Sequence, residues 1–402
     1  MAAVSVVEDA DGVRRLRINN RQQEGSSATR FADARQALLP LLLHPAPQRA
    51  LFLGLGTGVT AASAAEDPTL EVDAVELLPE VIDASALFRP SATDAPRWHL
   101  HAADARRYVR TTATRYDLIV ADNFHPARSG SGALYTVEHF SAVRERLAEG
   151  GLFCQWLPLH QLGIETLRTI VRSFLAANPN AWALLATNSL DTPVLGLVMG
   201  QGDARFAATD ARARIARSSW PQTLAEVGLA DDFALLGSFV AGPASLARFA
   251  AGAPLNTDDR PVVAYRAPRI TYAPDSRPRD RLLALLGEWH IEAEELLGTG
   301  AAAAPRLAAY WRARQRYLEV GQAVRPLSDA RQMLAQVRAP LLSVLRLSPD
   351  FRPAYDPLLR MAEHLARTDP SGTRALLSEL IQLQPDRLEA SQALSRLGGA
   401  PP

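Results

Sequence analysis

The sequence predicts an α/β fold built on a doubly wound, mostly parallel sheet, with a small β-hairpin region before it and a helical region after it. From residue 50 onward, short apolar runs alternate with segments of helical character. A glycine-rich run over 53–58 follows the first apolar run, and acidic residues end the next ones. Alternation of this kind is typical of a parallel sheet that helices cover on both faces.

Residues 1–46 are expected to form the N-terminal β-hairpin region. Polar and apolar residues alternate over 13–18, which indicates a strand, and Asn19-Asn20 supplies a turn. The apolar stretch 33–44 predicts a short helix that ends at His44-Pro45, because the residue before a proline is disfavoured in a helix.

Residues 47–268 are expected to form the main domain. We predict a helix over 137–147 and parallel strands at 51–53, 72–75, 98–102, 116–121 and 152–155. Two further strands, at 183–187 and 194–199, would close the sheet as a hairpin. A closing hairpin marks the class I methyltransferase-like (Rossmann-like) variant of the doubly wound sheet, which is the fold that we expect here.

Residues 269–402 are expected to form an all-helical domain. Segments 345–350 and 381–386 are alike, and their prolines are 36 positions apart (385 − 349). That spacing is close to the ~34 residues of tetratricopeptide (TPR) repeats. A TPR-like array and an ordinary helical bundle both fit. We expect this tail to serve protein contacts, including self-association.

Composition argues against several classes of protein. The net charge is zero and the pI is about 7.1, so no basic surplus predicts a nucleic-acid partner. No apolar run approaches ~18 residues, and the first residues lack a signal-peptide pattern, so no membrane segment is expected. The single cysteine, Cys154, fits a reducing compartment, which predicts a cytoplasmic location. No histidine stands at metal-ligand spacing, so we expect no metal.

The sharpest local signal is the run Leu53-Gly54-Leu55-Gly56-Thr57-Gly58 between an apolar strand and an Ala-rich helix. Glycines allow a tight turn and a close approach to a ligand. Glu76 follows 20 positions after Gly56 (76 − 56), at the end of the next strand, where a carboxylate accepts hydrogen bonds from ribose hydroxyls. The G-x-G-x-G spacing differs from the dinucleotide motif and fits S-adenosylmethionine-type enzymes better.

Two more acids end later strands. Asp104, followed by Ala105, ends the third strand, and Asp122 ends the fourth. Open α/β sheets bind ligands at the carboxyl ends of their strands, so one shared site is expected. The alternative for each acid alone is a helix N-cap.

The motifs of this region occur in a recognisable order. They are Gly54-Leu55-Gly56-Thr57-Gly58, Val75-Glu76, Asp104-Ala105, residues 116–122, Pro126, residues 133–136, 138–140 and 153–155. This order resembles the spermidine/spermine synthase (polyamine aminopropyltransferase) family over roughly residues 13 to 200. Residues 155–161 and 256–261 resemble a bacterial subgroup in which this module is often fused to a membrane domain.

The resemblance implies transfer of an aminopropyl group from decarboxylated S-adenosylmethionine to a diamine such as putrescine. Proteins of this family are commonly oligomers, so the resemblance also implies a homodimer. By the same resemblance, Gly54, Gly56, Thr57 and Gly58 would hold the donor. Glu76 would bind its ribose, and Asp104 with Ala105 its adenine. Asp122 would be the catalytic acid–base group. The remaining assignments are Gln22 or Gln23 closing over the nucleoside, and His125, Tyr135 and Gln155 on the amine side.

Three positions depart from the family pattern. Thr57 stands where the loop usually has an acid, and His125 stands where a second acid would hold the distal amine. The expected Tyr-His pair is replaced near Ala32-Asp33, and Asp33 and Glu24 are the candidates to compensate for the lost charge. Two alternatives therefore stay open. One is an S-adenosylmethionine-dependent methyltransferase of an unknown small molecule, and the other is a non-catalytic nucleoside-binding or scaffold protein.

Overall fold

The computed structural model describes residues 3–19, 22–88, 97–202, 206, 208–218 and 220–398, apart from the side chains of residues 22, 23, 208 and 398. The chain divides into two compact units, residues 1–297 and 298–402. Each unit is described by itself.

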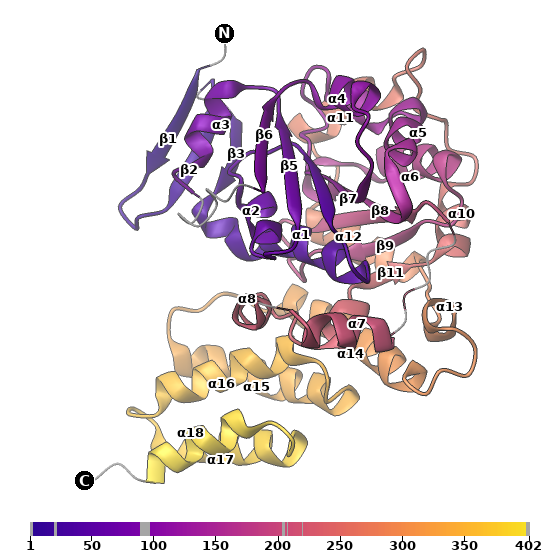
Figure 1. Ribbon diagram of the computed structural model, residues 1–402. Helices are drawn as coiled ribbons and strands as arrows, with labels where there is room; N and C mark the ends of the chain where they lie inside the picture. The colour runs from indigo at the N-terminus through magenta and orange to yellow at the C-terminus, as the bar shows by residue number, and fades with distance from the viewer. Residues whose placement is uncertain are drawn as a thin grey trace. The chain divides into compact units, whose positions relative to one another are not determined.

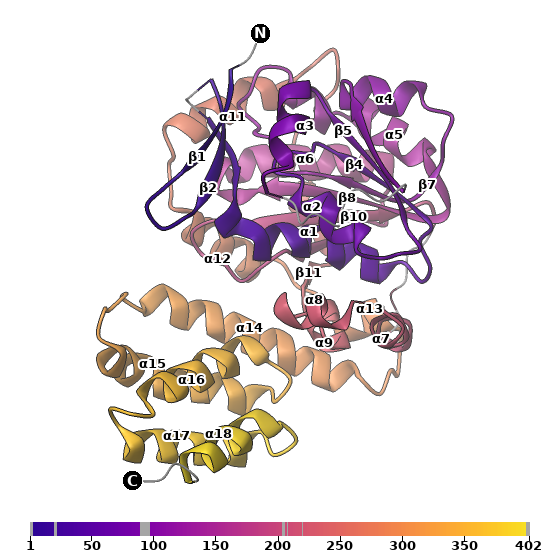
Figure 2. The same cartoon turned by 60° about the vertical axis from the view of Figure 1, so that its left-hand side comes forward.

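The first unit begins with a three-stranded antiparallel sheet in the order β1 (Val4–Glu8), β2 (Arg14–Ile18), β3 (Gln22–Ser26). Asn19, at the predicted turn, has a φ of 54°, a left-handed conformation that asparagine tolerates. Leu16 and Ile18 are buried against Val81 of α3 (Pro79–Ser85). Figures 1 and 2 show this small sheet beside α3. The N-terminal strands are therefore packed onto the main domain.

The main sheet has eight strands in the order β11-β9-β10-β8-β7-β4-β5-β6. In chain order these are β4 (Arg49–Leu53), β5 (Glu71–Glu76), β6 (Trp98–Ala102), β7 (Tyr116–Ala121), β8 (Leu147–Pro158), β9 (Trp182–Leu185), β10 (Val194–Gly200) and β11 (Phe239–Ala241). Strands β4 to β8 are parallel, and β10 runs antiparallel between β8 and β9. The predicted methyltransferase-like sheet with its closing hairpin is confirmed. The short edge strand β11 has no clear signal in the sequence.

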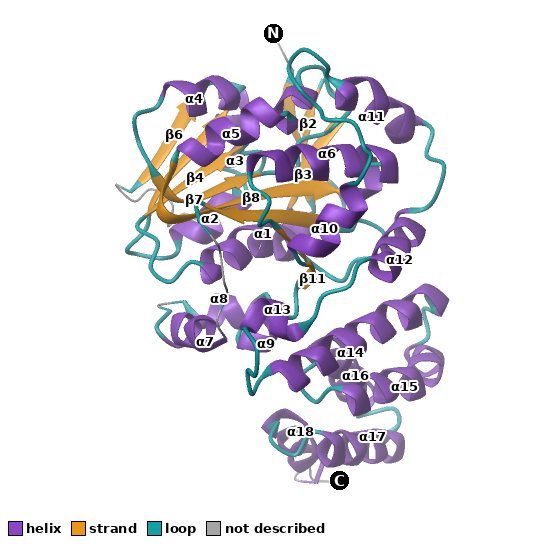
Figure 3. Ribbon diagram, turned by 90° about the vertical axis from the view of Figure 1, so that its right-hand side faces the viewer, coloured by secondary structure: helices purple, strands orange, loops and turns teal. Residues whose placement is uncertain are grey.

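Helices cover both faces of this sheet. Figure 3 shows α1 and α2 on one face and α4, α5 and α6 on the other. The remaining helical bounds in this unit are α1 (Arg30–Leu43), α2 (Val59–Ala65), α4 (Ala105–Thr111), α5 (Val137–Glu145), α6 (Ile164–Ala177), α7 (Ala208–Ala216), α8 (Pro221–Glu226), α9 (Asp232–Leu236), α10 (Pro243–Ala250), α11 (Val262–Tyr272), α12 (Pro278–Glu288) and α13 (Ala293–Leu297), with short 3-10 turns η1 (Ser27–Thr29), η3 (Ser131–Tyr135) and η4 (Leu159–Gln161).

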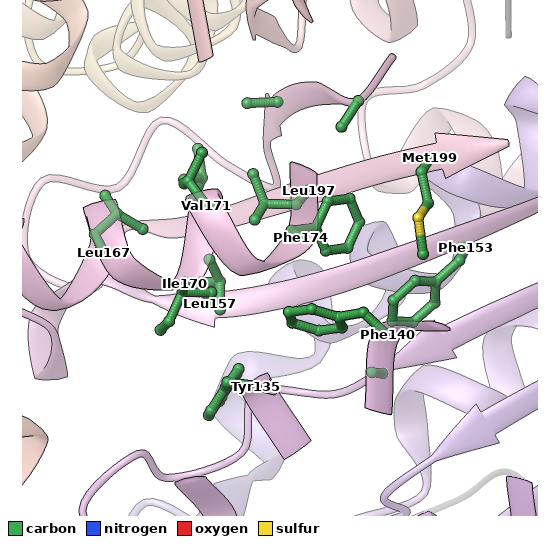
Figure 4. Packing of buried hydrophobic residues seen from close by; sticks show 14 of the residues in the cluster. Tyr135, Phe140, Phe153, Leu157, Leu167, Ile170, Val171, Phe174, Leu197 and Met199 are labelled. Carbon is green, nitrogen blue, oxygen red and sulfur yellow. The ribbon is translucent and has the colours of Figure 1, made fainter. Parts of the chain in front are cut away.

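The core lies between β7, β8, β10 and the helices α5 and α6. Phe140, Phe153 and Phe174 are fully buried there, with ring centroids 5.0 to 6.2 Å apart, and Figure 4 shows them packed against Met199 and Leu197. Aromatic packing of this kind adds to the hydrophobic stabilisation of the sheet. It holds β7 and β8 rigidly, and the loops at their carboxyl ends carry the site.

The boundary of the first unit differs from the predicted one. Residue 268 was expected to end the main domain, but α11 to α13 belong to the first unit, which extends to residue 297. Leu282, Leu285 and Trp289 lie in its core, and Trp289 stacks edge-on against Phe249 at 5.1 Å. The switch to helical composition after residue 268 is thus a change of secondary structure within one core.

The second unit is all-helical, with α14 (Ala304–Ala323), α15 (Ala330–Leu347), α16 (Arg352–Leu365), α17 (Pro370–Leu383) and α18 (Leu388–Gly398). Successive helices pack against each other. The similar segments 345–350 and 381–386 both contain a helix end and the following Pro-Asp turn, before α16 and α18. This arrangement of helical hairpins agrees with the expectation from the 36-residue spacing. Among the residues that the structure describes, no helix is long and apolar enough to cross a membrane.

Candidate active site

A pocket of about 280 Å³ opens at the carboxyl ends of β4, β5 and β7. The order of the strands reverses between β4 and β7, which is where open α/β sheets bind ligands. Eight of the predicted site residues line this pocket, namely Gly54, Gly56, Thr57, Glu76, Asp104, Ala105, Asp122 and His125. The structure therefore brings most of the sequence-predicted site together.

The loop after β4 requires glycine because its backbone has positive φ angles and because neighbouring side chains lie close to Gly54. Gly54 has a φ of +88°, and a Cβ there would lie 3.1 Å from Cε1 of Phe124 and 3.3 Å from Cβ of Asp122. Gly58, with a φ of +75°, begins α2 and is not part of the pocket wall. Only glycine adopts such angles without strain while leaving room for its neighbours. The loop is thereby shaped against the residues that follow β7.

Glu76 is tied to the glycine loop by hydrogen bonds. Its Oε2 accepts from the backbone N–H groups of Leu55 (3.2 Å) and Gly56 (3.4 Å), and its Oε1 accepts from that of Leu78 (3.1 Å). These bonds fix the carboxylate at the pocket wall. Its binding to a ribose stays a prediction.

Asp104 combines both of the roles considered for it. Its Oδ1 accepts from the backbone N–H of Arg107 at 2.8 Å, so it caps the N-terminus of α4. It also lines the pocket. The cap orients this side chain, and its contact with adenine stays a prediction.

Asp122 follows the end of β7 and forms part of the inner wall of the pocket. Its Oδ1 accepts from the backbone N–H of Asn123 at 2.7 Å. Burial raises the pKa of Asp122 to about 6, and the neighbouring Glu76 adds to this rise. Desolvation and a like charge both disfavour the ionised form, which is how enzymes bring carboxylates toward neutral pH.

Tyr135 and Gln155 lie behind this wall rather than on it. Tyr135 is fully buried, and its hydroxyl donates to the carbonyl of Phe124 at 2.7 Å. Gln155 donates through Nε2 to the carbonyls of Trp156 (2.9 Å) and Asp122 (3.4 Å). Neither residue is part of the pocket lining, so their prediction as amine-lining residues differs from this structure. Figure 4 shows Tyr135 at the edge of the aromatic core. Both residues position the segment from Asp122 to Phe124.

Gln22 and Gln23 were the candidates to close over the nucleoside. Their backbone forms β3, but their side chains lie outside the part of the chain that the structure describes. The prediction for Gln23 is therefore untested.

Two further acids line the pocket, Glu24 and Asp33. Glu24 pairs with Arg128 at 3.3 Å, and burial raises its pKa against the opposing effect of that arginine. Asp33, on α1, accepts a hydrogen bond from the hydroxyl of Thr29 at 2.8 Å. Burial raises the pKa of Asp33 to about 7, and the charge of Asp122 adds to the rise. The pocket is therefore acidic although Thr57 and His125 replace two family acids.

Several buried polar atoms around Asp122 have no hydrogen-bond partner within the described residues. They are Oδ1 of Asn123, Nδ1 of His125 and Oε1 of Gln155. Burial lowers the pKa of His125, so its ring is neutral at pH 7 and can accept a hydrogen bond. The oxygens of Asn123 and Gln155 are acceptors, and Nδ1 of His125 is an acceptor in the tautomer that carries its proton on Nε2. Buried polar groups without a partner indicate a bound water or a ligand, and this group calls for a ligand or water that donates hydrogen bonds.

The motif 256–261 contacts Arg106 of the pocket lining and the 3-10 turn η3, part of which also lines the pocket. The Nδ2 of Asn256 donates to the carbonyl of Gly132 at 3.0 Å, and its Oδ1 accepts from the N–H of Val263 at 3.1 Å. Asp258 pairs with Arg106, which lines the pocket. The motif thus joins η3 and α11 to α4. The sequence assigns this motif no role, because its contacts with Gly132 and Arg106 join residues more than a hundred positions apart.

Across the described ranges, no group of three or more His, Cys, Asp and Glu side chains is placed to hold a metal ion.

The sheet order, the glycine loop and the acids at three strand ends define a class I methyltransferase-type domain. Residues 36–182 match the family model of the spermine/spermidine synthase domain.

Curated relatives share this domain. Polyamine aminopropyltransferase 1 of Pseudomonas aeruginosa is 32% identical over 136 residues, which are 33% of this chain and 47% of that protein. Spermidine synthase of Dictyostelium discoideum is 27% identical over 146 residues, 35% of this chain and 51% of that protein. The chain thus spans about half the length of these relatives.

Solved structures agree on the fold. Spermidine synthase from Thermotoga maritima is 19% identical, covers 62% of this chain and 84% of its own, and has a TM-score of 0.50. A spermidine synthase in complex with the transition state analogue AdoDATO is 20% identical, with the same coverage and TM-score. At this identity the likeness shows the fold.

Proposed function

We propose that this chain transfers an aminopropyl group from decarboxylated S-adenosylmethionine to a diamine. The observation that carries the proposal is the lining of the pocket, where Asp33 and Asp122 lie with Asn123 and His125, each of which has a buried polar atom without a partner among the described residues. An ammonium group offers three N–H donors and a positive charge, and so complements both features. The names of the relatives, polyamine aminopropyltransferase and spermidine synthase, support the same reaction.

The donor would occupy the part of the pocket next to the glycine loop. Gly54 leaves space there that any side chain would fill. Glu76 and Asp104 offer carboxylate oxygens at the ends of β5 and β6, where hydroxyl and amino groups of a nucleoside would donate to them. The solved spermidine synthase that holds AdoDATO supports a nucleoside-bearing ligand at such a fold.

The reaction is a displacement at carbon. The amine nitrogen forms a bond to the aminopropyl carbon, the carbon–sulfur bond breaks, and its electron pair neutralises the sulfonium to a thioether. The new ammonium then loses a proton. The diamine is an ammonium ion in solution, with a pKa near ~10, and its reacting nitrogen must lose a proton before it attacks. Asp122, with a pKa raised to about 6, is mostly ionised at pH 7.5 and can orient the amine and accept that proton.

Methyl transfer from intact S-adenosylmethionine is the second candidate, and Thr57 favours it. The family acid at this position would attract the aminopropyl ammonium and repel a carboxylate. Thr57 is buried, and its hydroxyl lies 3.5 Å from the backbone N–H of Val59. The loop itself therefore offers no charge that selects against the intact donor.

The test offers each donor separately with a mixture of amines and identifies the products by mass spectrometry. We expect methylthioadenosine and a polyamine from decarboxylated S-adenosylmethionine, and at least a hundred-fold loss of rate in Asp122→Asn. Glu80→Gln, an exposed acid of α3 outside the pocket, is the matched control. S-adenosylhomocysteine would establish methyl transfer instead. Turnover of neither donor would leave the non-catalytic alternative. A cytoplasmic location, self-association through the helical tail and the absence of a nucleic-acid partner stay predictions.

A further inference from the structure

A diamine acceptor carries two positive charges, and each ammonium group needs an anionic partner in the pocket. Asp122 faces the amine that reacts. The second family acid is His125 in this chain, and burial lowers the pKa of that histidine, so it brings no negative charge. Glu24 and Asp33 are the two further acids of the pocket lining that could pair with the distal ammonium.

Glu24 is the weaker candidate. Its carboxylate pairs with Arg128 at 3.3 Å, and both residues line the pocket. A cation that approached Glu24 would have to compete with a guanidinium already in place. The charge of this acid is therefore largely compensated within the protein.

Asp33 is free of such compensation. Its only hydrogen-bond donor among the described residues is the neutral hydroxyl of Thr29, which reaches Oδ2, and it forms no ion pair there. Carboxylates that are partly buried without an ion pair are unusual. The free energy lost when such a carboxylate is desolvated is offset only by a cation or by hydrogen-bond donors.

The phase of α1 brings Asp33 into the lining of the same pocket as Asp122. Gln36 lies one turn further along α1, on the same face, since residues three apart are neighbours on a helix. The Oε1 of Gln36 accepts from Nδ2 of Asn123 at 2.6 Å, and Asn123 is the residue next to Asp122. The same face of α1 thus contacts the loop after β7 at one turn and presents Asp33 to the pocket at the turn before. The charge of Asp122 contributes to the raised pKa of Asp33.

We propose that Asp33 is the second anionic group of the acceptor subsite and receives the distal ammonium of a short diamine whose reacting amine lies at Asp122. Asp33 thereby replaces, from α1, the charge that His125 no longer supplies from the loop after β7. The acceptor class is then an α,ω-diamine, in preference to a monoamine or a neutral nucleophile. The inference rests on the proposed aminopropyl transfer.

The test compares 1,4-diaminobutane with butylamine, which lacks the distal charge. We expect Asp33→Asn to lower the ratio of kcat/KM for the diamine over the monoamine at least ten-fold, mainly through a higher KM for the diamine. His125→Asp, introduced into the Asp33→Asn variant, is expected to restore most of that ratio, because it returns a second acid to the pocket lining. Glu80→Gln should leave the ratio unchanged. An equal loss for both amines would overturn the proposal, since it would place Asp33 in proton transfer or folding.

Calorimetric binding of 1,4-diaminobutane to the folded wild type and to Asp33→Asn separates this inference from the proposed function. At least ten-fold weaker binding to the variant supports the inference even if no donor is consumed, a result that would sink aminopropyl transfer alone. Equal binding to both proteins, or no binding to either, overturns the role of Asp33. Circular dichroism of each variant verifies that it is folded.

Discussion

Gly25 of β3 lies directly against Thr57 of the glycine loop, so that a Cβ on Gly25 would stand 2.6 Å from the methyl carbon Cγ2 of Thr57. Both residues line the pocket. The N-terminal sheet and the glycine loop therefore meet at a contact that admits no further atom. This contact sets how closely β3 can cover the donor side of the pocket.

Gly25→Ala should consequently push β3 away from the loop. We expect a loss of about 1–3 kcal/mol in stability, as for other overpacked contacts, together with weaker donor binding. Thr57→Ser in the same variant should restore both properties, because serine keeps the hydroxyl and lacks Cγ2. Thermal unfolding and donor titration by calorimetry measure the two effects, with Thr57→Ser alone as the control. If serine fails to rescue Gly25→Ala, the contact does not govern the closure of β3.

The parts of the site that the sequence predicts well are local ones. The glycine loop, Glu76, Asp104 and Asp122 each follow a short apolar strand, and parallel strands bring their carboxyl ends to one edge of the sheet. Their meeting in one pocket thus follows from periodicity alone. The sequence also predicts a closing hairpin from two late strands, and β9 and β10 form it.

Features that depend on helix phase or distant contacts could not be assigned in this way. The sequence marks Asp33 only as a candidate, since its approach to Asp122 depends on the contact of Gln36 with Asn123, 87 residues away. Tyr135 carries the family motif, but its hydroxyl is turned to the carbonyl of Phe124 by the packing of η3. Likewise, Trp289 joins the core of the first unit across forty residues of chain from Phe249 (289 − 249), which composition cannot show.

The affinity for a diamine should fall as the pH falls. The pKa of Asp33 is raised to about 7 and that of Asp122 to about 6, so both carboxylates are ionised at pH 8 and largely protonated at pH 5.5. A diamine with pKa values near ~10 stays fully charged over this window, so the loss reports the protein alone. We expect the Kd for 1,4-diaminobutane to rise at least ten-fold from pH 8 to pH 5.5, measured by calorimetry. Asp33→Asn should flatten the upper part of this profile, and a pH-independent Kd in the wild type would contradict the assignment.

The ligand-free Asp33→Asn variant should be more stable than the wild type at pH 8. A carboxyl group with a pKa raised in the folded state binds its proton more tightly there than in the unfolded chain, so stability falls as the pH rises from about 4 toward 7. The full penalty is present above pH 7, and asparagine cannot ionise. Because Asp33 is only partly buried, we expect a gain on the order of 1–2 kcal/mol at pH 8 and little change at pH 4.

Urea unfolding of the ligand-free proteins at both pH values measures this gain. Glu80→Gln, which changes an exposed acid, is expected to show no such pH-dependent difference. A variant that is less stable than the wild type at pH 8 would mean that the Asp33 carboxylate is satisfied by the protein itself. Greater stability with weaker diamine binding would identify it as a group held ready for a ligand.

Urea unfolding also tests the contribution of Asn256 to the stability of the fold. This fully buried side chain bonds the carbonyl of Gly132 and the N–H of Val263, and its replacement by alanine would leave both backbone groups without a partner. Each unsatisfied buried group costs about 1–3 kcal/mol, so Asn256→Ala should lose about 2–4 kcal/mol in urea unfolding. Asn188→Ala, in a partly exposed loop, serves as the control.

Because Asp258, two residues after Asn256, pairs with Arg106 of the pocket wall, donor affinity should also fall in Asn256→Ala. A loss of stability with unchanged donor affinity would show that the motif supports the fold without shaping the pocket.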